Sequence, residues 1–464
     1  MKKIVFIDEV ILAIYLSLNQ QNLIHHICDI KLIKMKYAII LFLLSTLTAC
    51  VEPINKSFEK LPPGVWRGVL VLDHKSYLPA TDEEVSIKSD YTGELPFNFE
   101  VVYDDTDNFH ITIYNADEKI LVNSITYNRD KATAKDTLKI EFPDFDTYIS
   151  AIYEENIMEG YWHVPYKGTY SIPFKAYHGQ SHRFTTNKKE PITDISGKWS
   201  TLFEVGTEDE YPAIGEFKQT GNKVSGTFLT ETGDYRFLEG TLQGDKLFLS
   251  CFDAAHAFLF EGKILSDGSI TGIFKSGKHY TASWSATKNN DVKLGNAFEL
   301  TTANTPDETF NFTFPDLKGN DVSLSDEKFE NKIKLVKVTG SWCPNCKDET
   351  RFLKQYFEEN PTDQVEVIEI GFERYKDDAK NMAQLQRYKE KLDLPFTMLY
   401  GGYASKKLAS EKLPQISKVL SYPTLIFVNR NNKIVKVHTG FSGPATSEYK
   451  EFTESFDQIM KELI

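Results

Sequence analysis

The sequence predicts a multidomain chain in which an all-β N-terminal region, made of two related antiparallel modules, precedes a C-terminal α/β domain. The length of 464 residues suits about three domains of roughly 150 residues each. Two long stretches alternate apolar and polar residues with the period of antiparallel strands, and a third joins an apolar strand directly to a helix with one apolar face. We expect these parts to span residues 62–190 (β module 1), 192–288 (β module 2) and 291–464 (the α/β domain).

The composition is that of a folded protein, and its charge argues against one class of partner. Hydrophobic residues make up 41% of the chain and charged residues 26%, which excludes a disordered or fibrous protein. The formal net charge of −13 argues against a nucleic-acid-binding surface, because contacts to phosphates need clustered Lys and Arg. Five cysteines are too few for a disulfide scaffold, so their spacing carries the information.

The first 50 residues are expected to be an upstream extension and a signal segment. A basic start at Met35 leads into a short apolar run that ends in the small residues before Cys50, as in a secretory signal peptide. The run is too short to cross a bilayer, which needs about 20 apolar residues. The segment Leu47-Thr-Ala-Cys50 resembles the bacterial lipobox, which implies that Cys50 is lipidated and becomes the first residue of the mature protein. A plain signal peptide with a free Cys50 is the alternative.

Residues 1–34 do not fit a signal peptide. Asp8 and Glu9 interrupt their first apolar patch. We therefore expect translation to begin at Met35, with an uncleaved hydrophobic anchor as the alternative.

The two strand-rich stretches resemble each other. Three pairs of segments match in order and, within a few residues, in spacing: 64–66 with 197–199, 136–140 with 245–249, and 170–176 with 280–286. This pattern indicates a diverged internal duplication, which could form two small barrels or sandwiches or two halves of one. The histidines of this region are scattered, so no catalytic cluster stands out, and Cys251 is most simply a buried structural thiol.

The chemistry is concentrated in the last domain. Residues 334–339 form a near-continuous run of β-branched and apolar residues, as expected of a buried central strand. Cys343-Pro-Asn-Cys346 follows, and residues 347–360 place their apolar side chains on one face of a helix. The Cys-x-x-Cys segment therefore lies at a strand-to-helix junction, with its first thiol at the helix N-terminus.

That placement predicts a reactive thiol. A free thiol has a pKa of about 8.5, and the unpaired amides and dipole of a helix N-terminus lower it by stabilising the thiolate. The spacing lets the two sulfurs form a disulfide without unwinding the first turn. We expect Cys343 to be exposed and to attack a substrate disulfide, and Cys346, one turn inward, to resolve the mixed disulfide.

Two further residues are candidates for the same site. Glu349 lies on the helical face of Cys346 and is a plausible base for a buried thiol if burial raises its pKa. The alternative is an ordinary acid in the first helical turn. Pro423 precedes an apolar run and would interrupt a strand, so it is expected in a loop where its peptide bond could be cis.

These residues resemble a known family. Trp342-Cys-Pro-Asn-Cys346 with Tyr422-Pro-Thr424 downstream resembles the thioredoxin superfamily. More narrowly, the domain is similar to the membrane-tethered, extracytoplasmic thiol-disulfide reductases of the TlpA/ResA type. Residues 312–325 are similar to the N-terminal hairpin of that group, Glu349 matches its acid after the second cysteine, and residues 373–394 match its extra helical segment.

The resemblance implies a role for each of these residues. Cys343 would be the nucleophile, Cys346 the resolving thiol and Glu349 an acid in the cavity beneath them. Pro423 would be the cis-proline beside the disulfide, and Trp342 would pack against the pair. Neither a cofactor nor a metal is implied.

We therefore expect a protein-disulfide oxidoreductase of the cell envelope, anchored by lipid on the periplasmic face of the inner or outer membrane. The resemblance covers roughly residues 305–464. It implies that the protein reduces disulfides of cysteine-containing extracytoplasmic proteins. It also implies a membrane thiol-disulfide electron donor that recharges the pair.

Three other functions are alternatives to this one. A peroxidase of this fold needs Thr three residues before the reactive cysteine, where this chain has Gly340. A Cu(I) metallochaperone would add a distant histidine to the two thiolates, for which His438 is the candidate, although such proteins usually space their cysteines by three residues. In the third alternative function, the β modules bind a carbohydrate or a protein, and the redox domain is an appendage to them.

Overall fold

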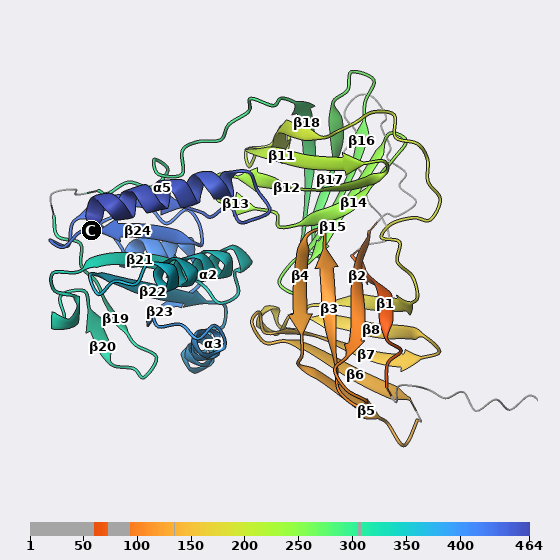
Figure 1. Cartoon of the computed structure of the whole chain (residues 1–464), viewed down its shortest axis with the longest axis horizontal. Helices are drawn as coiled ribbons and strands as arrows, with labels where there is room; N and C mark the ends of the chain where they lie inside the picture. The colour runs from red at the N-terminus through yellow and green to blue at the C-terminus, as the bar shows by residue number, and fades with distance from the viewer. Residues whose placement is uncertain (1–59, 73–92, 134, 305–307) are drawn as a thin grey trace, which may run out of the picture. The chain divides into compact units, whose positions relative to one another are not determined.

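The computed structural model describes residues 60–72, 93–133, 135–304 and 308–464 (Figure 1). The expected extension, the start at Met35, the signal peptide and the lipidation site Cys50 lie outside these residues. In the described part of the chain, no helix is both long enough and apolar enough to span a membrane.

The first β module is an antiparallel sheet of nine strands in the order β4-β3-β2-β1-β9-β8-β7-β6-β5. A short 3-10 helix, η1 (Pro165–Lys167), precedes the last strand. The strands are β1 (Gly64–Val71), β2 (Glu94–Tyr103), β3 (Phe109–Asn115), β4 (Glu118–Val122), β5 (Ile125–Arg129), β6 (Asp136–Phe142), β7 (Thr147–Glu154), β8 (Ile157–His163) and β9 (Ser171–His178).

The second β module is a nine-stranded sheet in the order β11-β10-β18-β17-β16-β15-β14-β12-β13, and it closes on itself because β11 also pairs with β12. Its strands are β10 (Gly197–Phe203), β11 (Tyr211–Thr220), β12 (Lys223–Thr230), β13 (Gly233–Asp234), β14 (Leu238–Gln243), β15 (Lys246–Phe252), β16 (Ala257–Ile264), β17 (Ile270–Ser276) and β18 (Tyr280–Lys288).

The structure confirms that the two modules are related. In each, the first strand pairs with both the second and the last strand of the module. Each first strand also buries one tryptophan, whose indole nitrogen donates to the carbonyl four residues earlier. Trp66 donates to Pro62 at 3.1 Å, and Trp199 donates to Ile195 at 2.8 Å. Because each sheet is complete within its own segment, the modules are not two halves of one sheet.

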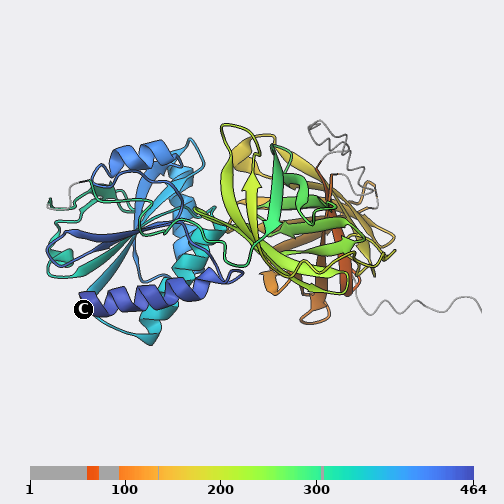
Figure 2. The same ribbon diagram turned by 90° about the horizontal axis from the view of Figure 1, so that it is seen from above.

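The C-terminal domain is α/β. Its central sheet has the order β23-β22-β21-β24-β25, in which β21, β22 and β23 are parallel and β24 and β25 are antiparallel to their neighbours. Helices cover both faces of this sheet (Figure 2). The sheet contains β21 (Ile333–Thr339), β22 (Val365–Glu373), β23 (Thr397–Tyr403), β24 (Thr424–Val428) and β25 (Ile434–Thr439), and the helices are α2 (Pro344–Glu359), α3 (Asp378–Lys391), α4 (Lys406–Lys412) and α5 (Glu448–Leu463).

The elements expected from the sequence of this domain are present. A separate two-stranded hairpin, β19 (Thr313–Pro315) with β20 (Asp321–Ser323), precedes the central sheet and is followed by the 3-10 helix η2 (Glu327–Phe329). Helix α3 occupies the predicted helical segment between β22 and β23. Strand β21 is buried along its whole length because it lies in the middle of the sheet, with Val336 and Val338 in one core and Leu335 in the other.

Each β module contains a glycine that leaves no room for a side chain, because the backbone of the neighbouring strand lies too close. A Cβ on Gly160 would lie 1.9 Å from the Ser150 carbonyl oxygen, and one on Gly272 would lie 2.1 Å from the Glu261 carbonyl oxygen. Because both obstacles are backbone atoms of the neighbouring strand, Gly272→Ala should lower the free energy of unfolding by about 1–3 kcal/mol. Urea denaturation followed by circular dichroism measures this change. Thr271→Ala on the same strand is the control, and an equal effect of the two substitutions would contradict the prediction.

Candidate active site

The two cysteines lie where the sequence predicts them, between β21 and α2. Cys343 is the N-cap residue of α2, and the backbone N–H of Cys346 points at its sulfur from 3.1 Å. The two sulfurs form a disulfide, with the Cα atoms 5.2 Å apart. The first sulfur therefore occupies the position at a helix N-terminus where unpaired N–H groups stabilise negative charge.

Cys343 is more covered than the sequence suggested. It is 6% exposed and Cys346 is fully buried, so the order of exposure is as predicted but Cys343 is not an exposed residue. Its sulfur lies 3.5 Å from the carbonyl oxygen of Tyr422, and the Tyr422 ring packs edge-on against Trp342 with 5.5 Å between centroids. The covering loop comes from a distant part of the sequence, which a local pattern around Cys343 does not reveal.

The loop that covers Cys343 contains the predicted proline. The Tyr422–Pro423 peptide bond is cis, and β24 begins at the next residue. Trp342 lies on the other side of the same loop, and its indole nitrogen donates to the Phe372 carbonyl oxygen at 2.8 Å. Pro423 and Trp342 are thus both brought to the disulfide.

A group of charged side chains is buried beneath Cys346. Glu349 and Lys337 are fully buried, and the Lys337 ammonium lies 3.7 Å from the Glu349 carboxylate. Lys337 also donates to the Cys346 carbonyl oxygen at 2.7 Å and to the Glu369 carboxylate at 3.2 Å. Neither oxygen of Glu349 has a hydrogen-bond partner. A carboxyl group with such surroundings is poorly stabilised as an anion.

The electrostatics of Glu349 follow from these contacts. Burial raises the pKa of Glu349 to about 7, Lys337 opposes that rise, and the nearby Glu369 adds to it. The group can therefore hold or accept a proton near neutral pH, on the same helix as the inner cysteine and three residues after it.

The sequence reasoning missed Lys337 and Glu369. A signal for the first was available, since a lysine in the middle of a buried β-branched strand needs a partner. A second missed pair lies just before the cysteines, where the backbone N–H and the hydroxyl of Ser341 donate to the Glu373 carboxylate at 2.7 and 2.8 Å. Burial raises the pKa of Glu373 to about 7 as well.

The β modules contact the first turn of α2, the helix that carries the disulfide. Lys347 pairs with Asp144 of β module 1, and Asp348 pairs with Arg236 of β module 2. Arg236 is only 4% exposed and also lies 2.9 Å from the Glu118 carboxylate of β module 1. Its guanidinium therefore joins both modules to α2 in one ionic cluster.

The turn between β12 and β13 contacts the same region from β module 2. The side-chain amide of Asn345, one of the two residues between the cysteines, lies 3.4 Å from the Asp234 carbonyl oxygen. The Ser421 hydroxyl, next to the cis-proline loop, donates to the Thr232 carbonyl oxygen at 2.7 Å. The surroundings of the disulfide are thus built by all three parts of the described chain.

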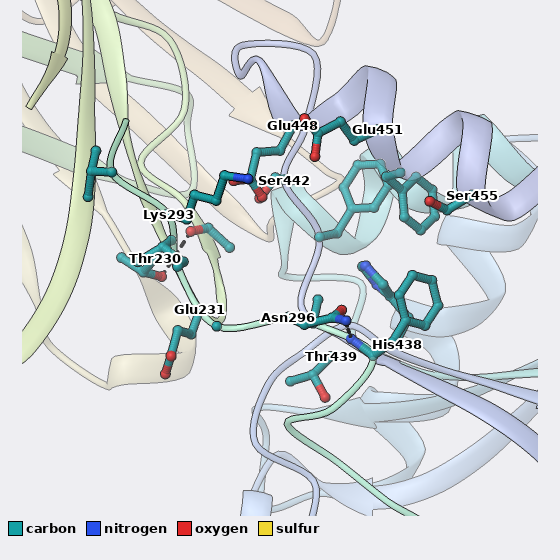
Figure 3. A pocket seen from close by; sticks show the side chains of 18 of the residues that line it. Thr230, Glu231, Lys293, Asn296, His438, Thr439, Ser442, Glu448, Glu451 and Ser455 are labelled. Atoms are coloured by element: carbon teal, nitrogen blue, oxygen red, sulfur yellow. Dashed lines mark hydrogen bonds between the residues drawn. The ribbon is translucent and has the colours of Figure 1, made fainter. Parts of the chain in front are cut away.

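His438, the candidate third ligand for copper, lies apart from the cysteines. Its ring packs between Phe298 and Phe452 at 4.7 Å from each, and burial lowers its pKa to about 4. It lines a cavity of about 500 Å³ whose lining contains no cysteine (Figure 3). Within the described residues, no group of three or more His, Cys, Asp or Glu side chains is placed to hold a metal ion.

The chain is similar to known redox proteins in this domain. Residues 304–452 match the Redoxin family. Over 148 residues, the chain is 26% identical to the thiol-disulfide oxidoreductase ResA of Halalkalibacterium halodurans, a match that covers 32% of this chain and 74% of that protein.

Solved structures are similar over a comparable share of the chain. A thiol-disulfide oxidoreductase from Bacteroides fragilis is 21% identical, with 32% of this chain and 99% of that one covered and a TM-score of 0.25. StoA from Bacillus subtilis is 20% identical, with 32% and 99% covered and a TM-score of 0.23. On the family match and the α/β architecture described above, residues 304–452 form a Redoxin domain of the thioredoxin superfamily.

Proposed function

We propose that the protein is a thiol-disulfide oxidoreductase that reduces disulfides of extracytoplasmic partner proteins through Cys343 and Cys346. The observation that carries this proposal is the disulfide between these residues at the N-terminus of α2. A helix N-terminus stabilises a thiolate, so reduction of this bond yields a nucleophile at Cys343. The likeness to ResA supports the same reaction class.

The first step is an attack by the reduced enzyme. The Cys343 thiolate forms a bond to one sulfur of the partner disulfide, and the other partner sulfur leaves as a thiolate. The N–H of Cys346, which faces the Cys343 sulfur at 3.1 Å, is placed to stabilise the attacking thiolate. The product is a mixed disulfide between Cys343 and the partner.

The second step releases the partner. The Glu349 carboxylate takes the proton of the Cys346 thiol, and the resulting thiolate attacks the Cys343 sulfur. The enzyme disulfide forms, and the second partner sulfur leaves as a thiolate and is then protonated. The partner gains two electrons and two protons in all, and the enzyme becomes oxidised. Pro423 and Trp342 would line the surface on which the mixed disulfide rests.

The location and the electron source are part of the proposal. The lipobox-like segment ending at Cys50 supports anchoring by lipid on the periplasmic face of the inner or outer membrane. A reductant outside the cytoplasm needs a supply of electrons, so we propose a membrane thiol-disulfide donor that restores the dithiol.

The direction of electron flow is tested by the reduction potential of the Cys343–Cys346 pair, measured by equilibration with glutathione. A reductant should give a value well below about −220 mV, as the reducing thioredoxins do. A value near about −120 mV, which is typical of strong oxidants, would reverse the assignment.

Removing the resolving thiol should stop the reaction at the mixed disulfide. Cys346→Ser leaves the Cys343 nucleophile in place, so the mixed disulfide with a partner peptide should form and persist, whereas Cys343→Ser should form none. Mass spectrometry of the enzyme after addition of an oxidised peptide measures the adduct. Cys251→Ala, which alters a buried thiol of β module 2 outside the Redoxin domain, serves as the control and should retain turnover. A stable adduct on Cys343→Ser would mean that Cys346, and not Cys343, attacks the partner disulfide.

Glu349 should set the pH dependence of the second step. Its pKa is raised to about 7 by burial, so its carboxylate fraction, and with it the rate of resolution, should rise with pH through that value. Glu349→Gln cannot accept the proton and should lose this inflection, with a rate at pH 8 lower by about tenfold or more. Stopped-flow fluorescence after mixing with an oxidised peptide measures the rate.

The control for that experiment is Glu359→Gln, which removes an exposed carboxylate from the end of the same helix. It should leave the profile unchanged. An inflection near pH 7 that survives in Glu349→Gln would assign the titration to another group, and Glu373 is the one with a matching pKa.

A further inference from the structure

A second cavity lies beside the redox site and is lined by cations. Its volume is about 240 Å³. Both β modules and the segment after β22 contribute to it. We name it the basic pocket, and the polar side chains that define it are Tyr166, Lys167, Tyr170, His256, His279 and Arg374.

The charged groups of Arg374 and Lys167 in the basic pocket both have uncharged hydrogen-bond partners. The Arg374 guanidinium donates to the Tyr166 hydroxyl at 2.8 Å, and the Lys167 ammonium lies 3.2 Å from Nε2 of His279. Burial lowers the pKa of His279 to about 4, so its ring is neutral and accepts from Lys167. Among the described residues, the hydrogen bonds of these two cations are thus with a neutral ring and a hydroxyl, and not with a carboxylate.

The surroundings disfavour this concentration of positive charge. Partial burial and, to a smaller extent, the neighbouring Arg374 together lower the pKa of Lys167 to about 8. Two nearby acids have other partners. Asp253 lies 3.1 Å from His256 of the basic pocket and 3.5 Å from Arg236. Glu373 accepts from the backbone N–H and the hydroxyl of Ser341. An anion entering the pocket would therefore gain two charge-assisted hydrogen bonds and relieve the repulsion between the cations.

The basic pocket is connected to the disulfide through one side chain. The guanidinium carbon of Arg374 lies 3.8 Å from the centre of the Trp342 ring, and Trp342 is the residue before Cys343. A polypeptide whose disulfide meets Cys343 can thus extend over Trp342 to the pocket within a few residues, because an extended chain advances about 3.3–3.6 Å per residue.

We propose that the basic pocket binds an acidic side chain of the disulfide partner, and so selects proteins that carry Asp or Glu a few residues from the reactive cysteine. The proposal rests on the thiol-disulfide exchange proposed above. The chain as a whole has a net charge of −13, so its overall field repels acidic partners. Only an acid that reaches this pocket gains from it, which makes the preference depend on position.

The test uses oxidised peptides that are identical except for one residue. That residue is Glu or Gln, placed one to five positions from the cysteine that Cys343 attacks, and the rate of mixed-disulfide formation is measured for each pair. For the full chain, the Glu/Gln rate ratio should peak at one spacing, at about three- to fivefold, the range of one partly exposed ion pair. In Lys167→Gln the peak should vanish, and in Lys167→Arg it should return.

The control is Lys218→Gln, which removes the same charge from an exposed position on β11 outside the pocket. It should keep the peak. A ratio that is flat across all spacings, or a peak that survives in Lys167→Gln, would overturn the basic pocket as a carboxylate site. Failure of the proposed function would look different, because then neither the Glu nor the Gln peptides would form a mixed disulfide.

Discussion

The first turn of α2 is the constraint on which the rest of the structure depends. It begins directly after its N-cap residue Cys343, and the backbone N–H of Cys346 faces the Cys343 sulfur. The same turn presents Lys347 and Asp348 to the β modules, which bind them through Asp144 and Arg236. One helical turn therefore sets both the acidity of the nucleophile and the position of the surfaces around it. The β modules contact the helix that carries the disulfide. This contact argues against the alternative in which the β modules are a separate binding unit and the redox domain is an appendage.

The buried charges below this turn explain why a carboxyl group can act as a base there. Burying Lys337 in a central strand is unfavourable unless its three donors are satisfied, and the Cys346 carbonyl, the Thr350 hydroxyl and the Glu369 carboxylate satisfy them. Glu369 takes the closer place beside Lys337, at 3.2 Å against 3.7 Å for Glu349. Glu349 is left with unpaired oxygens, so its anion is poorly stabilised and it holds its proton more tightly than an exposed carboxyl group. Burial is the main cause of its raised pKa of about 7, and the more distant Lys337 opposes that rise only in part.

The local sequence pattern predicted the features of the fold that depend on residues close together in the chain. Periodicity, turn residues and motif spacing predicted the junction at Cys343 and the relation between the two β modules. The hairpin at residues 313–323 and helix α3 were predicted from the resemblance to the TlpA/ResA type. The resemblance predicted Pro423 beside the disulfide, but not how closely the carbonyl of Tyr422 covers the Cys343 sulfur. The contact between Asn345 and Asp234 of β module 2, 111 residues away, could not be predicted from a local pattern. Lys337 lies between these cases. Its position in an apolar strand was visible, but its partner Glu369 is set by the register of β21 with β22.

Joining two β modules to a Redoxin domain changes which surfaces a partner meets. In the isolated α/β domain, Arg374 and Trp342 would face solvent as a stacked pair with one cation. In the whole chain, Lys167 and His279 are brought beside them from two different modules, and Arg236 fixes the modules to α2 by a buried ionic cluster. Because the charge of the pocket is assembled from all three parts, a preference for acidic partners is a property of the full chain and not of the domain that performs the exchange. Under these proposals, the cysteines carry out the exchange and the β modules contribute to the choice of partner.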